Sequence, residues 1–218
     1  MSVGAGYSVS VEDLLEKLRL HYNVASFFRV DLADGGGETV KTLVKPSNSF
    51  LLSFMDMLYS LFTAKLYMDF AYSWLRRTES FTIEGRTTSY TRDIAGIQAW
   101  ALKEDDSHGI IVGTGTAPPT AYDTWLESQV RNGTGAGQML HMSCDILTRR
   151  VVADMSSFDV KRSFVNASGG AIRVSELGLA VHVVRTGRNK LLIRDVIDPL
   201  DVPDGWSLTV TYTILVKL

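Results

Sequence analysis

The side chains that most often perform catalysis are few in this sequence and lie apart. The only cysteine is Cys144, and His141 is three residues before it. Because residues three apart on a strand point to opposite faces, the two are not expected to form a nucleophile–base pair. Cys144 is interpreted as a small core side chain. The four histidines, none with a second histidine at metal-ligand spacing, are His21, His108, His141 and His182. No Gly-x-Ser-x-Gly motif occurs, and we predict no enzymatic activity.

Two glycine-rich stretches invite comparison with phosphate-binding loops. Residues 131–137 are followed by a strand-like alternation, whereas a phosphate cradle delivers its amides at a helix N-terminus. Residues 112–120 lack the lysine of a nucleotide-binding loop and contain two adjacent prolines, which favour an extended backbone. We interpret both as flexible or partner-ordered loops, and we expect no cofactor.

Two acidic clusters could bind a hard cation through carboxylate oxygens. The first comprises residues 104–106, followed by His108, and the second comprises Asp198, Asp201 and Asp204. Neither has the alternate-residue spacing of a helix-loop-helix calcium site. We interpret both as solvated turns and predict no metal site, but cation binding by the second cluster stays open.

Composition restricts the class of protein further. The chain has 218 residues, of which 45% are hydrophobic, and 22 basic against 24 acidic side chains give a net charge of −2. This balance argues against a dedicated nucleic-acid binder, since phosphate contacts need a basic excess. Residues 1–9 lack the features of a secretory signal, and Asp56, Lys65 and Asp69 interrupt the apolar segment 50–70. We therefore expect neither secretion nor a membrane partner.

The N-terminal third is predicted to contain two helices and a hairpin. Residues 10–22 start with a capping serine and carry apolar side chains at helical spacing, and residues 50–64 are apolar almost all the way round. Residues 25–32 and 38–45 are predicted as strands around a glycine-rich turn. Residues 65–77 fit either a strand or a helix.

From residue 79 onward, period-two alternation replaces helical periodicity. In one run the alternation breaks between Val174 and Leu177, as a bulge near Glu176 and Gly178 would cause. Helical crossovers, which parallel strands need, are missing from this half. We therefore predict a mainly β fold, with a helical and hairpin region over 1–78 and an antiparallel β-sandwich of jelly-roll or Greek-key type over 79–218. Turns between strands are predicted at residues 166–170, 187–189 and 199–205.

Four segments of the C-terminal half, taken in order, carry a resemblance. They are GIIVGTG at 109–115 with PPT at 118–120, LES at 126–128, RSFVN at 162–166 leading to SELGL at 175–179, and LIRDV at 192–196 with VPDG at 202–205 and LTVTYTI at 208–214. In this order and spacing, residues 109–218 resemble a family of structural proteins of tailed bacteriophages and archaeal viruses. The resemblance implies a virion component, made in the host cytoplasm, of the head surface, neck, tail or baseplate.

The implied function is that of a repeated, symmetric subunit that binds further copies of itself and other virion proteins. Fixing the backbone of a glycine- and proline-rich loop costs about 1–2 kcal/mol per residue, which permanent subunit contacts offset. The residues that we expect at such contacts are Pro118, Pro119, Gly133, Gly135 and Gly137. The alternative is a carbohydrate-binding β-sandwich that recognises a glycan through exposed aromatic rings. The tryptophans considered for that role are Trp100, Trp125 and Trp206.

Overall fold

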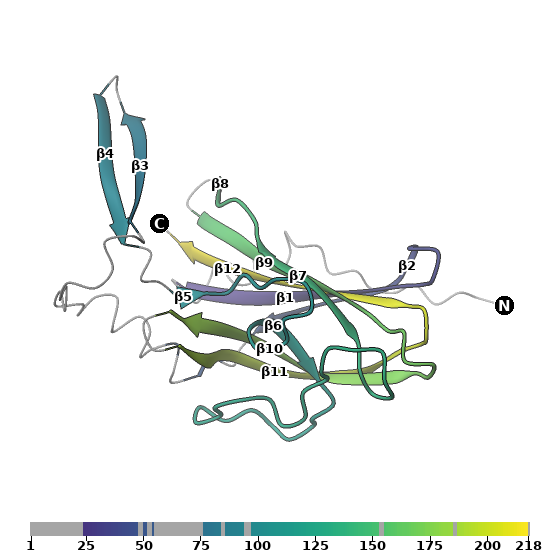
Figure 1. The fold of residues 1–218 in the computed structure, drawn as a ribbon. Coiled ribbons are helices and arrows are strands. Elements are labelled where there is room, and N and C mark those ends of the chain that lie inside the picture. The colour runs from purple at the N-terminus through teal and green to yellow at the C-terminus, as the bar shows by residue number, and fades with distance from the viewer. Residues whose placement is uncertain are drawn as a thin grey trace.

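The computed structural model describes residues 24–47, 50–51, 54, 76–83, 86–93, 97–152, 155–184 and 187–217. Within these ranges every named element is a β-strand, Phe54 is a single described residue in helical conformation, and every pairing between strands is antiparallel. Most of the strands belong to two stacked sheets (Figure 1). The mainly β, antiparallel class predicted from the alternation is confirmed.

The first sheet has six strands in the order β2-β1-β12-β9-β7, with β8 also paired to β9. Its strands are β1 (Val24–Ala33), β2 (Thr39–Ser47), β7 (Leu140–Ile146), β8 (Arg150–Val152), β9 (Met155–Val165) and β12 (Ser207–Lys217). Along β12, Leu208, Val210 and Tyr212 are fully buried, whereas Thr209 and Thr211 are half-buried. The alternation of this strand therefore sets which face meets the core.

The hairpin predicted over residues 25–32 and 38–45 is confirmed as β1 and β2. In its turn the Asp34 carboxylate accepts hydrogen bonds from the amides of Gly36 (2.9 Å) and Glu38 (3.0 Å). β1 also pairs along its length with β12. This hairpin, from the predicted N-terminal region, therefore shares a sheet with the last strand of the predicted β-region.

The second sheet has four strands in the order β11-β10-β5, with β6 also paired to β10. Its strands are β5 (Ile97–Gln98), β6 (Gly109–Gly113), β10 (Ile172–Val183) and β11 (Arg188–Val202). The register between β10 and β11 shifts between Val174 and Glu176, which confirms the predicted bulge. The turn predicted over 199–205 is wrong in its first half, because Leu200 still pairs with Val174. Pro199 lies in the irregular part of the register, where its missing amide hydrogen costs no ladder bond.

The two predicted N-terminal helices are not supported. Residues 10–22 lie outside the described residues, and only the start of residues 50–64 is described well enough to compare. There Phe50 forms an antiparallel bridge with Ile193, and the Leu51 amide donates a hydrogen bond to a β11 carbonyl (3.0 Å). A helix beginning at Phe50 is therefore wrong, because this segment first pairs with the edge of β11. Phe54 is helical, and residues 55–64 lie outside the described residues.

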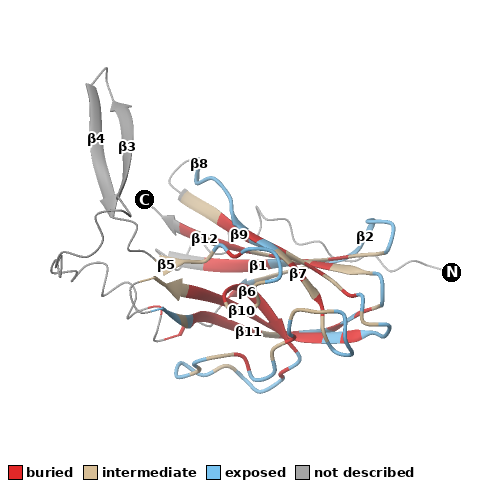
Figure 2. Ribbon diagram, viewed as in Figure 1, coloured by how far each residue is buried: buried red, intermediate tan, exposed pale blue. Residues whose placement is uncertain are grey.

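The main core is formed by residues of both sheets, whose facing strands are coloured as buried along much of their length (Figure 2). A buried polar contact joins the sheets through it: the Asp195 carboxylate of β11 accepts hydrogen bonds from the hydroxyls of Tyr212 (2.9 Å) and Ser47 (2.8 Å). The described strands β3 (Arg76–Ile83) and β4 (Arg86–Asp93) pair with each other as a separate two-stranded sheet.

Candidate functional site

The side chains of His141 and Cys144 point to the same face of the sheet, whereas the sequence predicts opposite faces. On β9 their pairing partners are Phe164 and Arg162, two positions apart, so both side chains lie on the same face of the sheet. The prediction of opposite faces is wrong because a register shift in β7 lies between the two residues. Burial raises the pKa of the Cys144 thiol to about 11 and lowers the pKa of His141 to about 4. Both groups are therefore neutral at pH 7, and the Cys144 Sγ accepts a hydrogen bond from a β6 amide (3.3 Å).

A second cluster has the composition of a Ser-His-Asp triad but not its geometry. The Ser107 Oγ lies 3.0 Å from the Nδ1 atom of His108, and the Asp105 carboxylate lies 3.3 Å from the same atom. In a triad the serine and the acid bind opposite ring nitrogens, whereas here Nε2 faces the carbonyl of Trp100 (2.9 Å). The cluster cannot pass a proton from serine through histidine, and it closes the loop before β6.

Beneath that loop lies Arg162 of β9, of which only 1% is exposed to solvent. Its guanidinium donates hydrogen bonds to the backbone carbonyls of Met142 (2.8 Å), His108 (3.0 Å), Ile110 (3.1 Å), Leu102 (3.4 Å) and Asp105. Burial lowers the pKa of Arg162. This side chain fixes the connection between β5 and β6 by donating to the carbonyls of Leu102, Asp105 and His108 in it, of which the contact with His108 is buried.

The structure does not gather the predicted acidic clusters into cation sites. Their members bind separate partners: Asp105 the Ser107 amide, Asp106 the Asn132 amide, Asp198 the Lys45 ammonium, Asp201 the Arg173 guanidinium and Asp204 the Gly169 amide. In the part of the chain that the structure describes, no group of three or more acidic, histidine or cysteine side chains could hold a metal ion.

The most distinctive feature is the long connection between β6 and β7. Residues 114–139 contain no named strand, although connections longer than about 12–15 residues are uncommon and usually functional. We call residues 114–130 the arm and residues 131–138 the glycine loop. The arm passes beneath β10 and β11, on the side of the second sheet away from the first (Figure 1).

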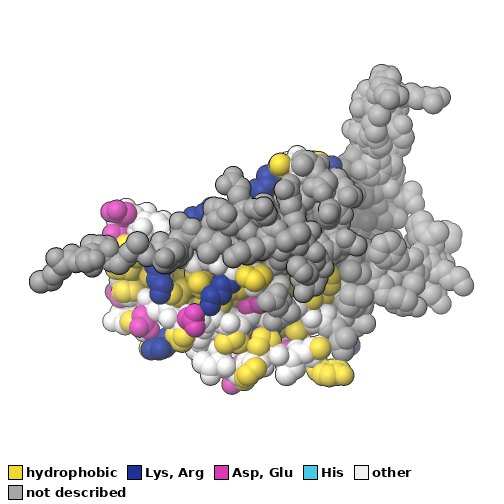
Figure 3. Space-filling view, turned by 180° about the vertical axis from the view of Figure 1, so that it is seen from behind, with side chains coloured by type: hydrophobic (Ala, Val, Ile, Leu, Met, Phe, Trp, Pro, Cys, Tyr) yellow, Lys and Arg dark blue, Asp and Glu magenta, His cyan; other side chains and the backbone are white. Residues whose placement is uncertain are grey.

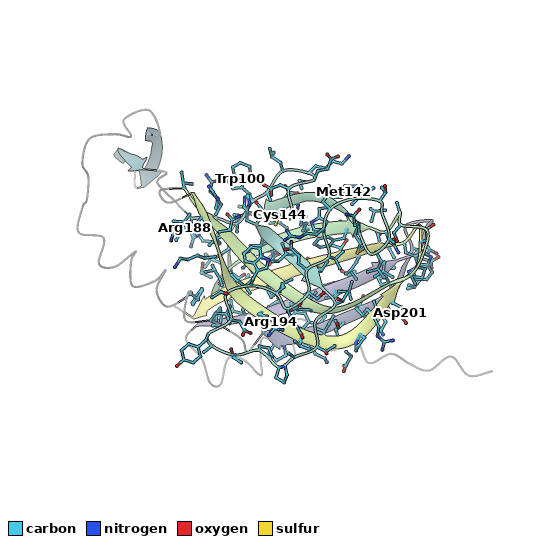
Figure 4. All side chains as sticks on the ribbon, turned by 60° about the horizontal axis from the view of Figure 1, so that its bottom comes forward. Trp100, Met142, Cys144, Arg188, Arg194 and Asp201 are labelled. Carbon is cyan, nitrogen blue, oxygen red and sulfur yellow. The ribbon has the colours of Figure 1, made fainter. Side chains whose placement is uncertain are left out.

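A buried ion pair on the outer face of the second sheet anchors the arm. Glu176 of β10 is fully buried, and its carboxylate accepts hydrogen bonds from the arm amides of Glu127 (2.7 Å) and Ser128 (3.2 Å). The Nε of Arg194, on β11, donates to the same carboxylate at 2.6 Å. Figure 4 shows Arg194 beside the arm. These two side chains tie the C-terminal half of the arm to the sheet.

The same guanidinium also holds the N-terminal half of the arm. Arg194 donates to the carboxylate of Asp123 (2.6 Å) and to the carbonyl of Ala117 (3.1 Å). The Glu127 carboxylate accepts hydrogen bonds from the amides of Thr116 and Ala117, both at 2.8 Å. Hydrogen bonds from these amides lower the pKa of Glu127. The arm is thus closed on itself and bound to the sheet by charge-assisted hydrogen bonds.

Glycines allow this close approach. A side chain at Gly113 would meet the Ser128 carbonyl at 2.6 Å, and one at Gly178 would meet Leu126 and Leu191 at 2.9 Å. Leu126 and Leu191 belong to a second apolar cluster, separate from the main core, against which Trp125 packs. The arm therefore adds a third layer over the second sheet.

The predicted contact residues lie on the arm and the glycine loop, and the chain orders both regions itself. The amide of Gly135 donates to the Gln138 side chain (2.9 Å), and that of Gly133 donates to the Met139 carbonyl (3.1 Å). The exposed predicted contact residues are Pro118, Gly135 and Gly137, and the half-buried ones are Pro119 and Gly133. Their role at subunit contacts stays a prediction.

Sequence reasoning missed the residue that stands out most on the arm. Tyr122 is 81% exposed and lies in the turn that the Asp123 amide closes by donating to the Thr120 carbonyl (3.2 Å), next to the carboxylate that Arg194 binds. By contrast, Trp125 is half-buried and donates its indole N–H to Gln129 (2.8 Å), and Trp206 packs against the main core. The arrangement presents one large aromatic side chain on an ordered loop, and such residues often dominate binding energies at protein interfaces.

Comparison of the chain with family models, with curated proteins and with solved structures gives no match. Among the described residues, no helix has the length and apolar character needed to cross a membrane. The site is therefore interpreted from its own geometry.

Proposed function

We propose that this chain is a structural subunit that acts by binding proteins, as a repeated component of a virion. The observation that carries the proposal is the arm, which holds the exposed Tyr122 in place through Glu176 and Arg194. An ordered loop loses less conformational entropy on binding than a flexible one. The virion context comes from the resemblance of residues 109–218.

The chemistry of the buried groups supports a role without catalysis. Cys144 and His141 are neutral at pH 7. The Ser107 hydroxyl and the Asp105 carboxylate both face the same ring nitrogen of His108. A subunit that works through contacts needs none of these groups to react.

The finer fold type belongs to the same proposal. Two packed antiparallel sheets suit a sandwich of jelly-roll or Greek-key type, and the strand order β2-β1-β12-β9 supports it. In that order β1 lies beside β12, so neighbours in the sheet are distant in sequence, a feature shared with Greek-key folds, where a strand returns to lie beside an earlier one.

Mass spectrometry of purified particles of the encoding virus, with copy-number estimation, tests the proposal. We expect the chain in the particle, in about a dozen copies for a neck or tail ring or in hundreds for the head surface. Its absence from particles would overturn the proposal.

The carbohydrate-binding alternative makes a different prediction. Trp125 and Trp206 are engaged within the chain, and among the residues whose burial is described the large exposed aromatic rings are those of Trp100 and Tyr122. Binding to a glycan panel that is lost in both W100A and Y122A would favour the alternative. No detectable binding to any glycan of the panel would support the structural role.

A further inference from the structure

His141 of β7 is an ionisable side chain that is fully buried. Its exposed fraction is 0%, and its ring packs edge-on against Phe164 of β9, with 4.9 Å between the ring centroids. Most charged side chains lie differently: on the face shown in Figure 3, Lys and Arg side chains reach the surface beside acidic ones. Burying a charge without a partner is costly, so a proton added to this histidine would destabilise its surroundings.

The hydrogen bonds of the ring determine which nitrogen would take up that proton. Nε2 lies 3.2 Å from the carbonyl of Val130, at the end of the arm, and it carries the hydrogen because a carbonyl can only accept. Among the described residues, the Nδ1 atom has no hydrogen-bond partner. A second proton would therefore bind at Nδ1 and produce a buried N–H group without an acceptor.

The charged groups around the ring also disfavour its protonated form. Arg162 of β9 and Arg131 of the glycine loop repel a positive ring, whereas Asp106 attracts it but is already paired with Arg131 at 3.6 Å. Glu104 contacts the residue through its backbone amide, which donates to the His141 carbonyl (2.8 Å). Burial, followed by the charge of Arg162, lowers the pKa of His141 from 6.5 to about 4. The closed structure therefore favours the neutral ring.

His141 is joined directly to the base of the glycine loop. Its backbone amide donates to the side chain of Asn132 (3.0 Å). Across the base, the Gly133 amide donates to the Met139 carbonyl and the Met139 amide donates to the Arg131 carbonyl, both at 3.1 Å. The tip of the loop is exposed and contains two glycines, whose backbones gain freedom when a loop opens. Opening this loop therefore disturbs less of the structure than separating strands of either sheet.

We propose that His141 is an acid-sensitive latch: its neutral ring holds the glycine loop closed against the start of β7, and its protonated ring releases the loop. The coupling is direct, because the ring binds Val130, the residue immediately before the loop. Glu176 and Arg194 hold the arm independently of this contact. The inference goes beyond the proposed function and does not depend on it.

The sign of the pH dependence follows from the two states of the ring. When the loop opens, water reaches the ring and its pKa returns towards 6.5, so the open state binds the proton more tightly than the closed state. The contribution of His141 to closure is complete above about pH 6.5 and is lost progressively as the pH falls to about 4.

The test is hydrogen exchange of the purified full chain between pH 7 and 5, above the range in which carboxylates usually titrate. The amides of Gly133 and Met139 report on the loop base, and those of β10 report on the second sheet. After correction for the intrinsic pH dependence of exchange, we expect the protection of the two loop amides to fall roughly 20-fold, because opening takes up one proton. The protection of β10 should stay constant.

Two variants identify the group that titrates. In H141Q the glutamine amide can still donate to the Val130 carbonyl but does not titrate, so the loop protection should not change with pH. H182Q is the matched control, because His182 of β10 is a half-buried histidine whose Nδ1 lies 2.7 Å from the Asn189 side chain. We expect H182Q to behave like the wild type.

Three results would overturn the inference. They are a loop protection that is constant with pH in the wild type, the same pH dependence in H141Q, and a parallel loss of protection in β10, which would indicate global unfolding. Circular dichroism checks that H141Q folds. If it does not, NMR titration of the His141 ring in the wild type decides: titration at the ordinary value of 6.5 contradicts the latch, and titration below it, together with the loss of loop protection, supports it.

Discussion

Two buried arginines, one in each sheet, hold two of the described connections, residues 99–108 and the arm, in different ways. Arg162 of β9 donates only to backbone carbonyls in its hydrogen bonds, and it fixes the loop before β6 inside the protein. Arg194 of β11 binds the carboxylates of Glu176 and Asp123 and fixes the arm on the surface. Correspondingly, burial lowers the pKa of Arg162, whereas for Arg194 hydrogen bonds to carboxylates outweigh burial and raise the pKa.

The charge of the hydrogen-bond acceptors around each arginine determines what its site can do. The carbonyls around Arg162 carry no net charge, and burial keeps its positive charge inside the protein, where no partner meets it. The carboxylates around Arg194 leave negative charge near an exposed aromatic side chain, which a partner can recognise. Of the two, the arginine with acidic partners is the one that holds the surface that we propose for binding.

The largest effect is expected from R162M. Removing the guanidinium leaves several buried carbonyls without a donor, and each unsatisfied group costs about 1–3 kcal/mol. We expect a loss of about 4 kcal/mol or more in the free energy of unfolding, measured by urea denaturation. A loss below about 1 kcal/mol would mean that the carbonyls find other donors and that the comparison fails.

R194M is expected to cost somewhat less, about 3 kcal/mol, because it leaves the fully buried Glu176 without its cation. It should also release the arm, which we would follow by limited proteolysis within residues 114–130. R173M is the matched control: its partner Asp201 is 3.9 Å away and both side chains are exposed, so we expect a change within about 0.5 kcal/mol. An intact arm in R194M would contradict the anchoring role.

Acid should loosen the arm before it unfolds the sheets. Hydrogen bonds from the amides of Ala117 and Thr116 hold the pKa of Glu127 below its usual value of 4.5. A depressed pKa stabilises the folded arm above the unfolded value, and this contribution is lost as the pH falls through the lower folded value. We therefore expect the fluorescence of Trp125 to change below about pH 4.5 while far-UV circular dichroism stays constant.

The variant E127Q separates this titration from others near the arm. The pKa of Asp123 is also lowered, with hydrogen bonds from Thr120 and Arg194 outweighing burial, so part of the acid response belongs to that carboxylate. We expect E127Q to weaken the fluorescence transition. An identical transition in wild type and E127Q would exclude Glu127 as its source.

The smallest effect on stability is expected from Y122A. The side chain is 81% exposed, so its removal should change the free energy of unfolding by less than about 0.5 kcal/mol. The same substitution is expected to weaken the protein binding that we propose for the arm. If this variant loses binding while its urea midpoint stays unchanged, Tyr122 serves binding and not folding.

The sequence by itself determined those features that depend on near neighbours. The hairpin of β1 and β2, the alternation of β12 and the bulge near Glu176 follow from side-chain period and turn chemistry within a few residues. The buried position of Arg162 also follows the alternation of β9, although its five carbonyl partners do not.

Only the tertiary structure decided which distant residues meet. Asp123, Glu127, Glu176 and Arg194 come from the arm and from two strands, and nothing in their spacing indicates that they converge. The register shift that places His141 and Cys144 on one face, and the pairing of Phe50 with Ile193, likewise depend on the partner strand. The physical reason is that strand period is a local property. Convergence of charges depends on which strands pair and on which face of a sheet a connection crosses.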